Sequence, residues 1–323
     1  MTTTAPAPAP VAAARRRTAL RPSGLVWTLL RLHRTALLVW LGFVAFTAAL
    51  LLWLQGPGAS AAQDKLEALG YAGVQLSASS SDLLFAFTSG VYNDLFYDPG
   101  TLITLASFGV ALFAAGPLTA RELESGTAQL VWGQSPSPAR WLAAKLAMPA
   151  LFITAGMSLL VVLYRLLWDT HGNLLIAGIQ PRAFYFSVGP ATVAAALLGL
   201  ALGAIAGLAV RRTLPALTLA GFGYFLVNAF RTNSWPFQGR YQQPELHSRS
   251  WAITSKGAQI PDPGCYDNRQ CLAKHDIVRF GREYLPSPDY WPRQLLETGV
   301  LLGLTALAVT AAFLVLRSRS NHV

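Results

Sequence analysis

The side chains that could do chemistry gather in one short segment of an otherwise apolar chain, residues 120–145. It begins with the run Arg-Glu-Leu-Glu, followed by Ser-Gly-Thr, a short apolar stretch and a turn rich in proline and serine. This pattern predicts a charged helical turn that a glycine ends, then a second short helix, with the charges facing water. Such a surface suits contact with a partner protein, and the alternative is an ordinary charged connector. The residues of interest are Arg121, Glu122, Glu124, Gly126, Thr127 and Arg140.

Side-chain sets that perform catalysis are missing from the sequence. It contains no Gly-x-Ser-x-Gly nucleophile elbow, no His-Glu-x-x-His zinc motif and no Gly-x-x-x-x-Gly-Lys-[Ser/Thr] phosphate loop. Nothing in the chain would therefore cradle the phosphates of ATP. We expect no enzymatic activity and no cofactor, and any ATP that drives the protein would have to be bound by another chain.

The two cysteines, Cys265 and Cys271, lie in a polar stretch near the C-terminus. A Cys-x5-Cys pair in an oxidising compartment is expected to form a disulfide, with two free thiols as the alternative. His247 and His275 could add metal ligands, but no tight Cys-x2-Cys or His-x3-His spacing accompanies them. We therefore expect no metal site.

The composition indicates the class of protein that holds these groups. Of 323 residues, 53% are hydrophobic and only 12% are charged, about half the charged share of a soluble domain. The mean hydropathy is +0.40. These values exclude a disordered chain and argue against a soluble enzyme. The net charge of +10 is therefore assigned to loops that orient a membrane protein rather than to nucleic-acid binding.

Six runs are apolar and long enough to cross a bilayer, which requires about 20 residues of helix. The expected fold class is all-α: a polytopic membrane protein with six transmembrane helices and a long outer loop between spans five and six. The expected spans are residues 35–54, 101–120, 147–168, 188–210, 214–230 and 298–316.

Small residues recur at every fourth position of the fourth span. Such a stripe lets another helix approach closely, either within the same bundle or in a second subunit. The helix-packing positions are Ala191, Ala195, Gly199, Gly203 and Gly207.

The expected spans contain a single charged residue, Arg165, which lies near the end of the third span and could reach the interface by snorkelling. They contain no carboxylate. Carriers coupled to protons or sodium usually need an intramembrane acid or a broken helix. A self-powered secondary transporter is therefore not expected.

Basic residues indicate which side each loop faces. They are concentrated before the first span, after the second and fourth spans, and after the sixth. The positive-inside rule then predicts a plasma-membrane protein with both termini cytoplasmic and loops 55–100, 169–187 and 231–294 outside. Aromatic residues of the first outer loop, including Phe96, are expected to rest on the outer interface.

The chain thus divides into five regions. The predicted regions are a disordered tail (1–14), a basic interfacial segment (15–34), spans one to five with loop 121–145 (35–230), an extracellular loop or small cap (231–294), and span six with the C-terminal tail (295–323).

Arg121-Glu122, followed by Gly126-Thr127 and a Ser-Pro-x-Arg element ending at Arg140, resembles the first cytoplasmic loop of ABC type-2 exporter permeases. In that family this loop forms the coupling helix that docks into a separate ATPase subunit. The resemblance implies coupling roles for the six residues of interest and assembly as a homodimer or as a heterodimer with a second permease, in contact with membrane lipid. No nucleic-acid partner is expected.

Two further features bear on the resemblance. The segment from Trp27 to Arg34 resembles the N-terminal element of actinobacterial members, whereas the long polar loop 231–294 departs from the family pattern. The leading hypothesis is a membrane-spanning permease subunit of an ATP-driven ABC exporter. The alternative is a non-transporting membrane anchor or sensor whose outer cap binds a ligand. The sequence does not indicate the transported substrate.

Overall fold

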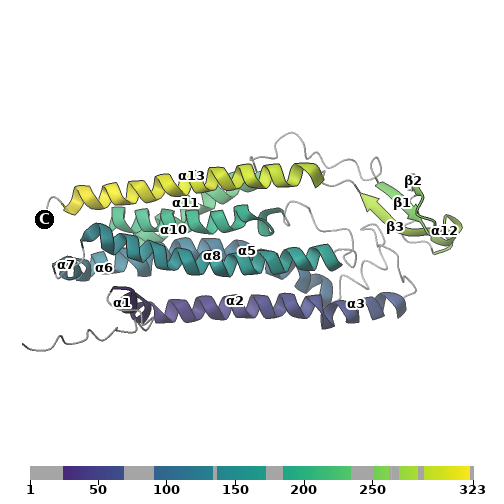
Figure 1. Cartoon of the computed structure of the whole chain (residues 1–323), viewed down its shortest axis with the longest axis horizontal. Coiled ribbons are helices and arrows are strands. Elements are labelled where there is room, and N and C mark those ends of the chain that lie inside the picture. The colour runs from purple at the N-terminus through teal and green to yellow at the C-terminus, as the bar shows by residue number, and fades with distance from the viewer. Residues whose placement is uncertain are drawn as a thin grey trace, which may run out of the picture.

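Long helices run side by side and form an elongated bundle, with a small β-sheet beyond one end (Figure 1). The computed structural model describes residues 25–68, 91–133, 137–171, 185–233, 250–261, 263, 269–282 and 287–320. Six helical segments are long and apolar enough to span a membrane, which confirms the predicted all-α fold with six spans. They are Arg34–Lys65, Asp98–Glu124, Pro138–His171, Pro190–Val210, Thr213–Thr232 and Tyr290–Ser318.

The boundaries of the helices coincide with residues that cap or break helices. Ser137 precedes α8 and accepts a hydrogen bond from the backbone N–H of Arg140 at 3.3 Å, while Pro138 takes the first helical position. Arg211 ends α10 in the left-handed conformation. The bundle helices are α1 (Leu25–Leu32), α2 (Arg34–Gln55), α3 (Pro57–Ala68), α5 (Val91–Phe113), the π-helix η1 (Ala114–Ala120), α6 (Arg121–Glu124), α7 (Thr127–Trp132), α8 (Pro138–His171), α10 (Pro190–Val210), α11 (Thr213–Asn233) and α13 (Ser287–Ser320).

The small-residue stripe of α10 packs inside the chain and is covered by neighbouring helices. A Cβ added at Gly199 would lie 2.8 Å from the carbonyl oxygen of Ser107 on α5. One added at Gly203 would lie 2.7 Å from the Cβ of Ala114 on η1. Both distances are too short for real side chains, so only glycine allows α10 to approach α5 and η1 this closely.

The remainder of the stripe contacts another helix. Ala191 and Ala195 are buried in a cluster that includes Leu301 of α13. Gly207, at the other end of α10, lies against η1, since a Cβ there would be 2.6 Å from the carbonyl oxygen of Ala115. The stripe therefore holds α10 between α5, η1 and α13 of the same chain.

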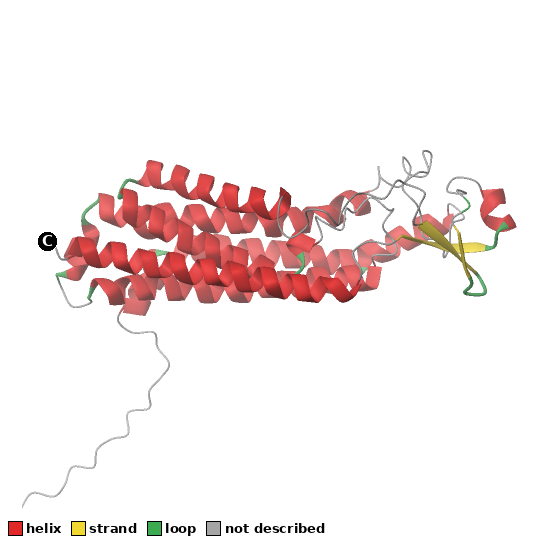
Figure 2. Ribbon diagram, turned by 90° about the horizontal axis from the view of Figure 1, so that it is seen from above, coloured by secondary structure: helices red, strands yellow, loops and turns green. Residues whose placement is uncertain are grey.

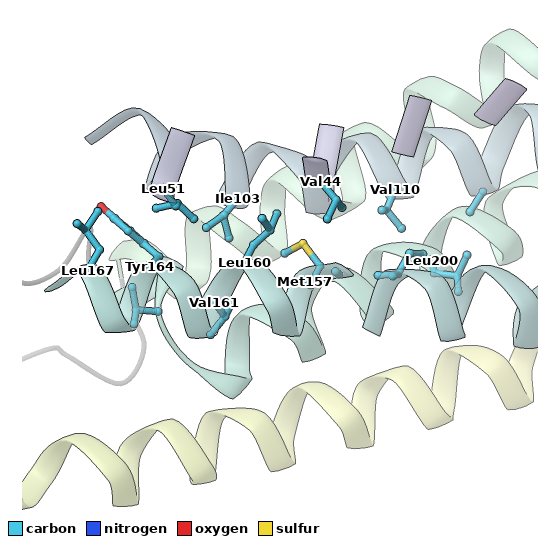
Figure 3. Packing of buried hydrophobic residues seen from close by; sticks show 14 of the residues in the cluster. Val44, Leu51, Ile103, Val110, Met157, Leu160, Val161, Tyr164, Leu167 and Leu200 are labelled. Carbon is cyan, nitrogen blue, oxygen red and sulfur yellow. The ribbon is translucent and has the colours of Figure 1, made fainter. Parts of the chain in front are cut away.

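Helices α2, α5 and α8 share one apolar core (Figure 3). Leu51 of α2, Ile103 of α5 and Met157 and Leu160 of α8 point toward one another in this view. Each of them is almost wholly buried. Close van der Waals packing of these side chains holds the helices together, because in a bilayer the surrounding lipid is as apolar as the core itself.

Phe96 corrects one expectation. It was predicted to rest on the outer interface, but it lies on α5, which begins about ten residues before the predicted span. Its side chain is fully buried, with ring centroids 6.1 Å from Tyr164 and 6.4 Å from Trp168. Phe96 therefore belongs to the core between α5 and α8. The remaining residues named for the loop's interface, such as Phe85, lie outside the described residues or have undescribed side chains.

The spanning helices carry more charge than the sequence predicted. Arg231 lies in the segment Thr213–Thr232 and Glu297 in the segment Tyr290–Ser318, each just outside the apolar run from which the span was predicted. Lys145 lies in Pro138–His171. The predicted spans themselves contain no carboxylate, and these charges lie where the helices continue past the ends of their apolar runs.

A small sheet lies beyond the bundle, at the end opposite α6 and α7 (Figures 1 and 2). Its three antiparallel strands have the order β2-β1-β3, with Ala252 opposite both Ile260 and Phe280. Cys271 is disulfide-bonded, whereas Cys265 lies outside the described residues. The elements here are β1 (Ser250–Thr254), β2 (Gln259–Pro261), α12 (Arg269–Lys274) and β3 (Ile277–Arg282).

Candidate functional site

The π-helix η1 leads from α5 into the charged segment singled out in the sequence. Pro117 lies inside it and cannot donate a backbone hydrogen bond. The hydroxyl of Thr119 donates to the carbonyl oxygen of Ala114 at 2.7 Å, and the N–H of Arg121 donates to the carbonyl of Gly116, five residues earlier. The chain thus leaves the bundle through a widened helical turn, a feature often found at functional sites.

The α6–α7 loop, residues 121–133, lies at the end of the bundle that also carries α1 and the last residues of α13 (Figure 1). Gly126 separates its two short helices and has φ of +73°, which a side chain would strain. The hydroxyl of Thr127 donates to the carbonyl oxygen of Glu122 at 3.2 Å and lies 3.0 Å from the hydroxyl of Ser125. Gly126 and Thr127 therefore shape the predicted helix–turn–helix.

Glu122 ties the loop to α8. Its Oε1 lies 2.5 Å from Nζ of Lys145, whose side chain is only 1% exposed. Nζ also donates to the carbonyl oxygen of Leu118 at 2.6 Å and lies 4.6 Å from the ring centroid of Trp141. The expectation that Glu122 faces water is wrong, because this buried ammonium draws the carboxylate inward.

Glu124 ties the loop to α11. Its Oε2 accepts hydrogen bonds from the backbone N–H of Thr213 at 2.8 Å and from the hydroxyl of the same residue at 2.5 Å. Thr213 is the first residue of α11, where unpaired N–H groups and the helix dipole both favour a carboxylate. Glu124 thus acts as a capping group supplied from a different helix.

The third tie runs through η1 to α10. Thr119 and Ala115 of η1 lie against Gly207, so close that the glycine could not gain a side chain without movement. The α6–α7 loop is therefore anchored to three spanning helices by three kinds of contact: an ion pair, a cap and close backbone packing.

The outer surface of the loop is exposed. Arg121 and Thr127 of the loop and Arg140 at the start of α8 are exposed, and for the two arginines exposure agrees with the prediction that the charges face water. Leu130 is 70% exposed, and the sequence reasoning did not single it out. Ala128 and Leu130 point in nearly opposite directions on α7, and the structure buries Ala128 and leaves Leu130 exposed, which the short apolar run alone does not decide.

A second polar cluster lies at the other end of the bundle. Nε of Arg231 donates to Oε1 of Glu297 at 2.6 Å, and both side chains are almost wholly buried. Gln294 donates from Nε2 to the carbonyl oxygen of Tyr185 at 2.9 Å. Burial, reinforced by the negative charge of Glu297, raises the pKa of Tyr185 far above its usual range. The ion pair between Arg231 and Glu297 joins α11 to α13, and the two charges neutralise each other.

Arg165, the one charge predicted inside a span, has a partner on its own helix. Its Nε lies 3.0 Å from Oδ2 of Asp169, and the guanidinium lies 5.1 Å from the ring centroid of Tyr290. Both side chains of the ion pair are partly exposed. Within the described residues, no group of three or more His, Cys, Asp or Glu side chains could hold a metal ion.

Comparison with known proteins supplies the remaining finding. The family model described as ABC-2 membrane transporter related matches residues 27–233, which contain α2 to α11 and the whole α6–α7 loop. Neither the curated proteins nor the solved structures with which the sequence was compared include a match. The match covers more than half of the chain and agrees with six apolar helices and the absence of a phosphate loop from the sequence. This chain belongs to the ABC-2 membrane transporter related family.

Proposed function

We propose that this protein is the membrane-spanning subunit of an ATP-driven exporter, and that a separate ATPase subunit docks on the α6–α7 loop. The observation that carries this proposal is the combination of an exposed surface on the loop with three ties that join the loop to the spanning helices. A partner bound at Arg121, Thr127, Leu130 and Arg140 would move a segment that is fixed to α8, α10 and α11.

The coupling mechanism follows from those ties. A partner that binds ATP, hydrolyses it and releases the products can shift the permease only if it docks differently on two permease states. Glu122 and Glu124 would then transmit the displacement through Lys145 and Thr213, rather than contact the ATPase themselves. The arginines and Leu130 would supply the contact surface.

The orientation and assembly are part of the same proposal. An ATPase is cytosolic, so the end with α1, α6 and α7 would face the cytoplasm in the plasma membrane, together with both termini. The β-sheet and the Cys271 disulfide would then lie outside, where an oxidising compartment supports disulfides. Two copies of this chain, or this chain and a related permease, would assemble with two ATPase subunits. Cys265 would be the other half of the disulfide.

The test is recovery of the ATPase with a tagged permease from native membranes in mild detergent. We expect an ATPase with a phosphate loop to copurify with the unchanged protein. Charge reversal by Arg121→Glu or Arg140→Glu, and the change Leu130→Asp, should each reduce that recovery by about tenfold, equivalent to about 1.4 kcal/mol of binding free energy. Lys256→Glu, an exposed charge reversal at the far end, is the matched control.

Two outcomes would overturn the proposal. Equal recovery of the ATPase with all three variants would remove the docking surface from the α6–α7 loop and from the start of α8. Failure of any ATPase to copurify with the unchanged protein would favour the anchor or sensor hypothesis. Glu122→Lys is unsuitable as a docking test, because it would set a second ammonium against buried Lys145 and unfold the loop.

A further inference from the structure

A cavity of about 330 Å³ lies between α1, α2, α5 and α8, near the end of the bundle that carries the α6–α7 loop. Its walls are almost entirely aliphatic and aromatic, and the only ionisable residues among them are His33 and Lys145. The ammonium of Lys145 already pairs with Glu122. The indole N–H of Trp40 is also occupied, since it donates to the carbonyl oxygen of Phe152 at 3.1 Å. The cavity thus offers an apolar interior.

Small residues create this space. Gly109 of α5 lines the cavity, and a Cβ added there would meet no atom within 4 Å. Ala36 and Ala106 line it from α2 and α5. An apolar lining of this kind favours apolar molecules over water, which finds few polar partners there.

The cavity opens on the lipid-facing side of the bundle. Gly109 and Val39 both line it and are both exposed, and Val39 retains 73% of its surface. Both residues belong to helices that are long and apolar enough to span a membrane. A ligand would therefore enter from the bilayer, between α2 and α5. The volume is near the lower limit of about 300 Å³ for ligand pockets, so it suits one hydrocarbon chain.

Two arginines lie next to the cavity-lining residues of α1 and α2 in the sequence, although neither lines the cavity itself. Arg31 and Arg34 are exposed and flank His33, which lines the cavity. The chain contains no acidic residue between residues 25 and 63. Arginines beside an apolar site at the membrane surface attract anionic headgroups, whereas zwitterionic headgroups gain less from them.

We propose that this cavity binds one acyl chain of an anionic phospholipid from the adjoining leaflet, with the headgroup held at Arg31 and Arg34. The lipid would brace α1 against α2, α5 and α8, behind the α6–α7 loop. This site stands on the cavity and on the two exposed arginines that neighbour His33 in the sequence, and it is independent of whether an ATPase docks on the loop.

The experiment offers the purified, delipidated protein equal amounts of phosphatidylglycerol and phosphatidylcholine in detergent, and quantifies the retained lipids by mass spectrometry. The unchanged protein should retain phosphatidylglycerol in several-fold excess. Gly109→Leu should reduce that retention by about tenfold, because the leucine occupies the space of at least two methylene groups of the chain. Gly42→Leu is the matched control, since Gly42 lies on α2 outside the cavity and its Cβ would also meet nothing within 4 Å.

Ala36→Leu fills the cavity from α2 and provides a second filling variant if Gly109→Leu does not yield a monodisperse protein. Neutralisation by Arg31→Gln with Arg34→Gln should abolish the preference for phosphatidylglycerol while leaving total retention measurable. The proposal is overturned if both filling variants retain phosphatidylglycerol as the unchanged protein does. It is equally overturned if the unchanged protein retains the two lipids without preference.

Discussion

Glu124 caps α11 through Thr213, although the two residues lie 89 positions apart in the chain. One carboxylate oxygen accepts both the backbone N–H and the hydroxyl of Thr213. Glu124 is the last residue of the continuous helical segment Asp98–Glu124, so the cap joins the end of that helix to the start of α11. The cap therefore fixes where the α6–α7 loop lies relative to the hairpin of α10 and α11.

This cap predicts energetic coupling between two positions. Glu124→Ala and Thr213→Val should each lower the thermal unfolding temperature, and the double variant should lose less than the sum of the two single losses. Limited proteolysis should cut the loop faster in each single variant. Strictly additive losses of stability would show that the two side chains do not interact. Thr218→Val, on the exposed face of the same helix, is the control for loss of a threonine hydroxyl.

The buried ion pair of Arg231 and Glu297 predicts a large asymmetry between single and double variants. Glu297→Leu leaves a guanidinium buried without its carboxylate and should destabilise the protein by about 3–5 kcal/mol. Arg231→Met combined with Glu297→Leu should recover most of that loss. Denaturant unfolding of the purified protein measures the stability lost in the single variant and in the double variant.

The more exposed pair on α8 provides the comparison for that prediction. Arg165→Met interrupts the ion pair with Asp169 and should change stability by less than about 1 kcal/mol, because solvent screens partly exposed charges. If Glu297→Leu were as mild as Arg165→Met, the buried pair would not hold α11 to α13.

Gly203→Ala should destabilise the bundle by about 1–3 kcal/mol, since its methyl group would overlap Ala114 on η1. The matched change Gly223→Ala adds the same methyl group on α11, where a Cβ meets nothing within 4 Å. Alanine also has the higher helix propensity, so this control should be neutral or stabilising by up to about 1 kcal/mol. Thermal unfolding of the two variants measures the difference between their effects on stability. Equal effects would argue against close packing of α10 on η1.

His33 predicts a loss of stability in acid. Burial, with a smaller effect from the positive charge of Lys145, lowers the pKa of His33, and Glu122 partly opposes this. The unfolded chain therefore binds a proton at His33 at a higher pH than the folded chain does. Between these two pKa values stability rises with pH, so acidification through the window favours unfolding.

The measurement compares unfolding temperatures of lipid-free protein at about pH 7.5 and about pH 5.5, which bracket the usual histidine pKa. The unchanged protein should lose more stability on acidification than His33→Gln does. His275→Gln is the control, because His275 is exposed at the far end. An identical acid loss in His33→Gln and the unchanged protein would contradict the prediction.

The six spans could be predicted because a helix that crosses a bilayer needs a long run of apolar residues, and such a run is visible in the local sequence. Twenty apolar residues in a row reveal a helix wherever its neighbours lie. The same reasoning missed Glu297, because a helix can continue beyond its apolar run when a distant residue, here Arg231, compensates the charge. Hydropathy contains no information about that partner.

In the α6–α7 loop, too, the local sequence predicts some features, whereas others depend on distant residues. Its helix–turn–helix followed from a charged run and Gly126, which are local signals. The different directions of Glu122 and Glu124 depend on Lys145 and Thr213, which other helices bring to the loop. The strands were missed although the sequence held signals for them: β-branched residues occur in β1 and β3, and a glycine, Gly257, stands in the turn after β1.

The π-helix η1 also determines the direction in which the side chains of α6 point. Each residue of an α-helix turns the chain by about 100°, and a wider turn changes the direction in which the following residues point. Glu122 meets Lys145 and Glu124 meets Thr213 only because η1 ends at the correct rotation. One residue more or fewer in η1 would swing both carboxylates away from their partners. The length of η1, seven residues, therefore sets the rotation at which both carboxylates leave the helix, so an insertion or deletion in η1 should act on both contacts at once.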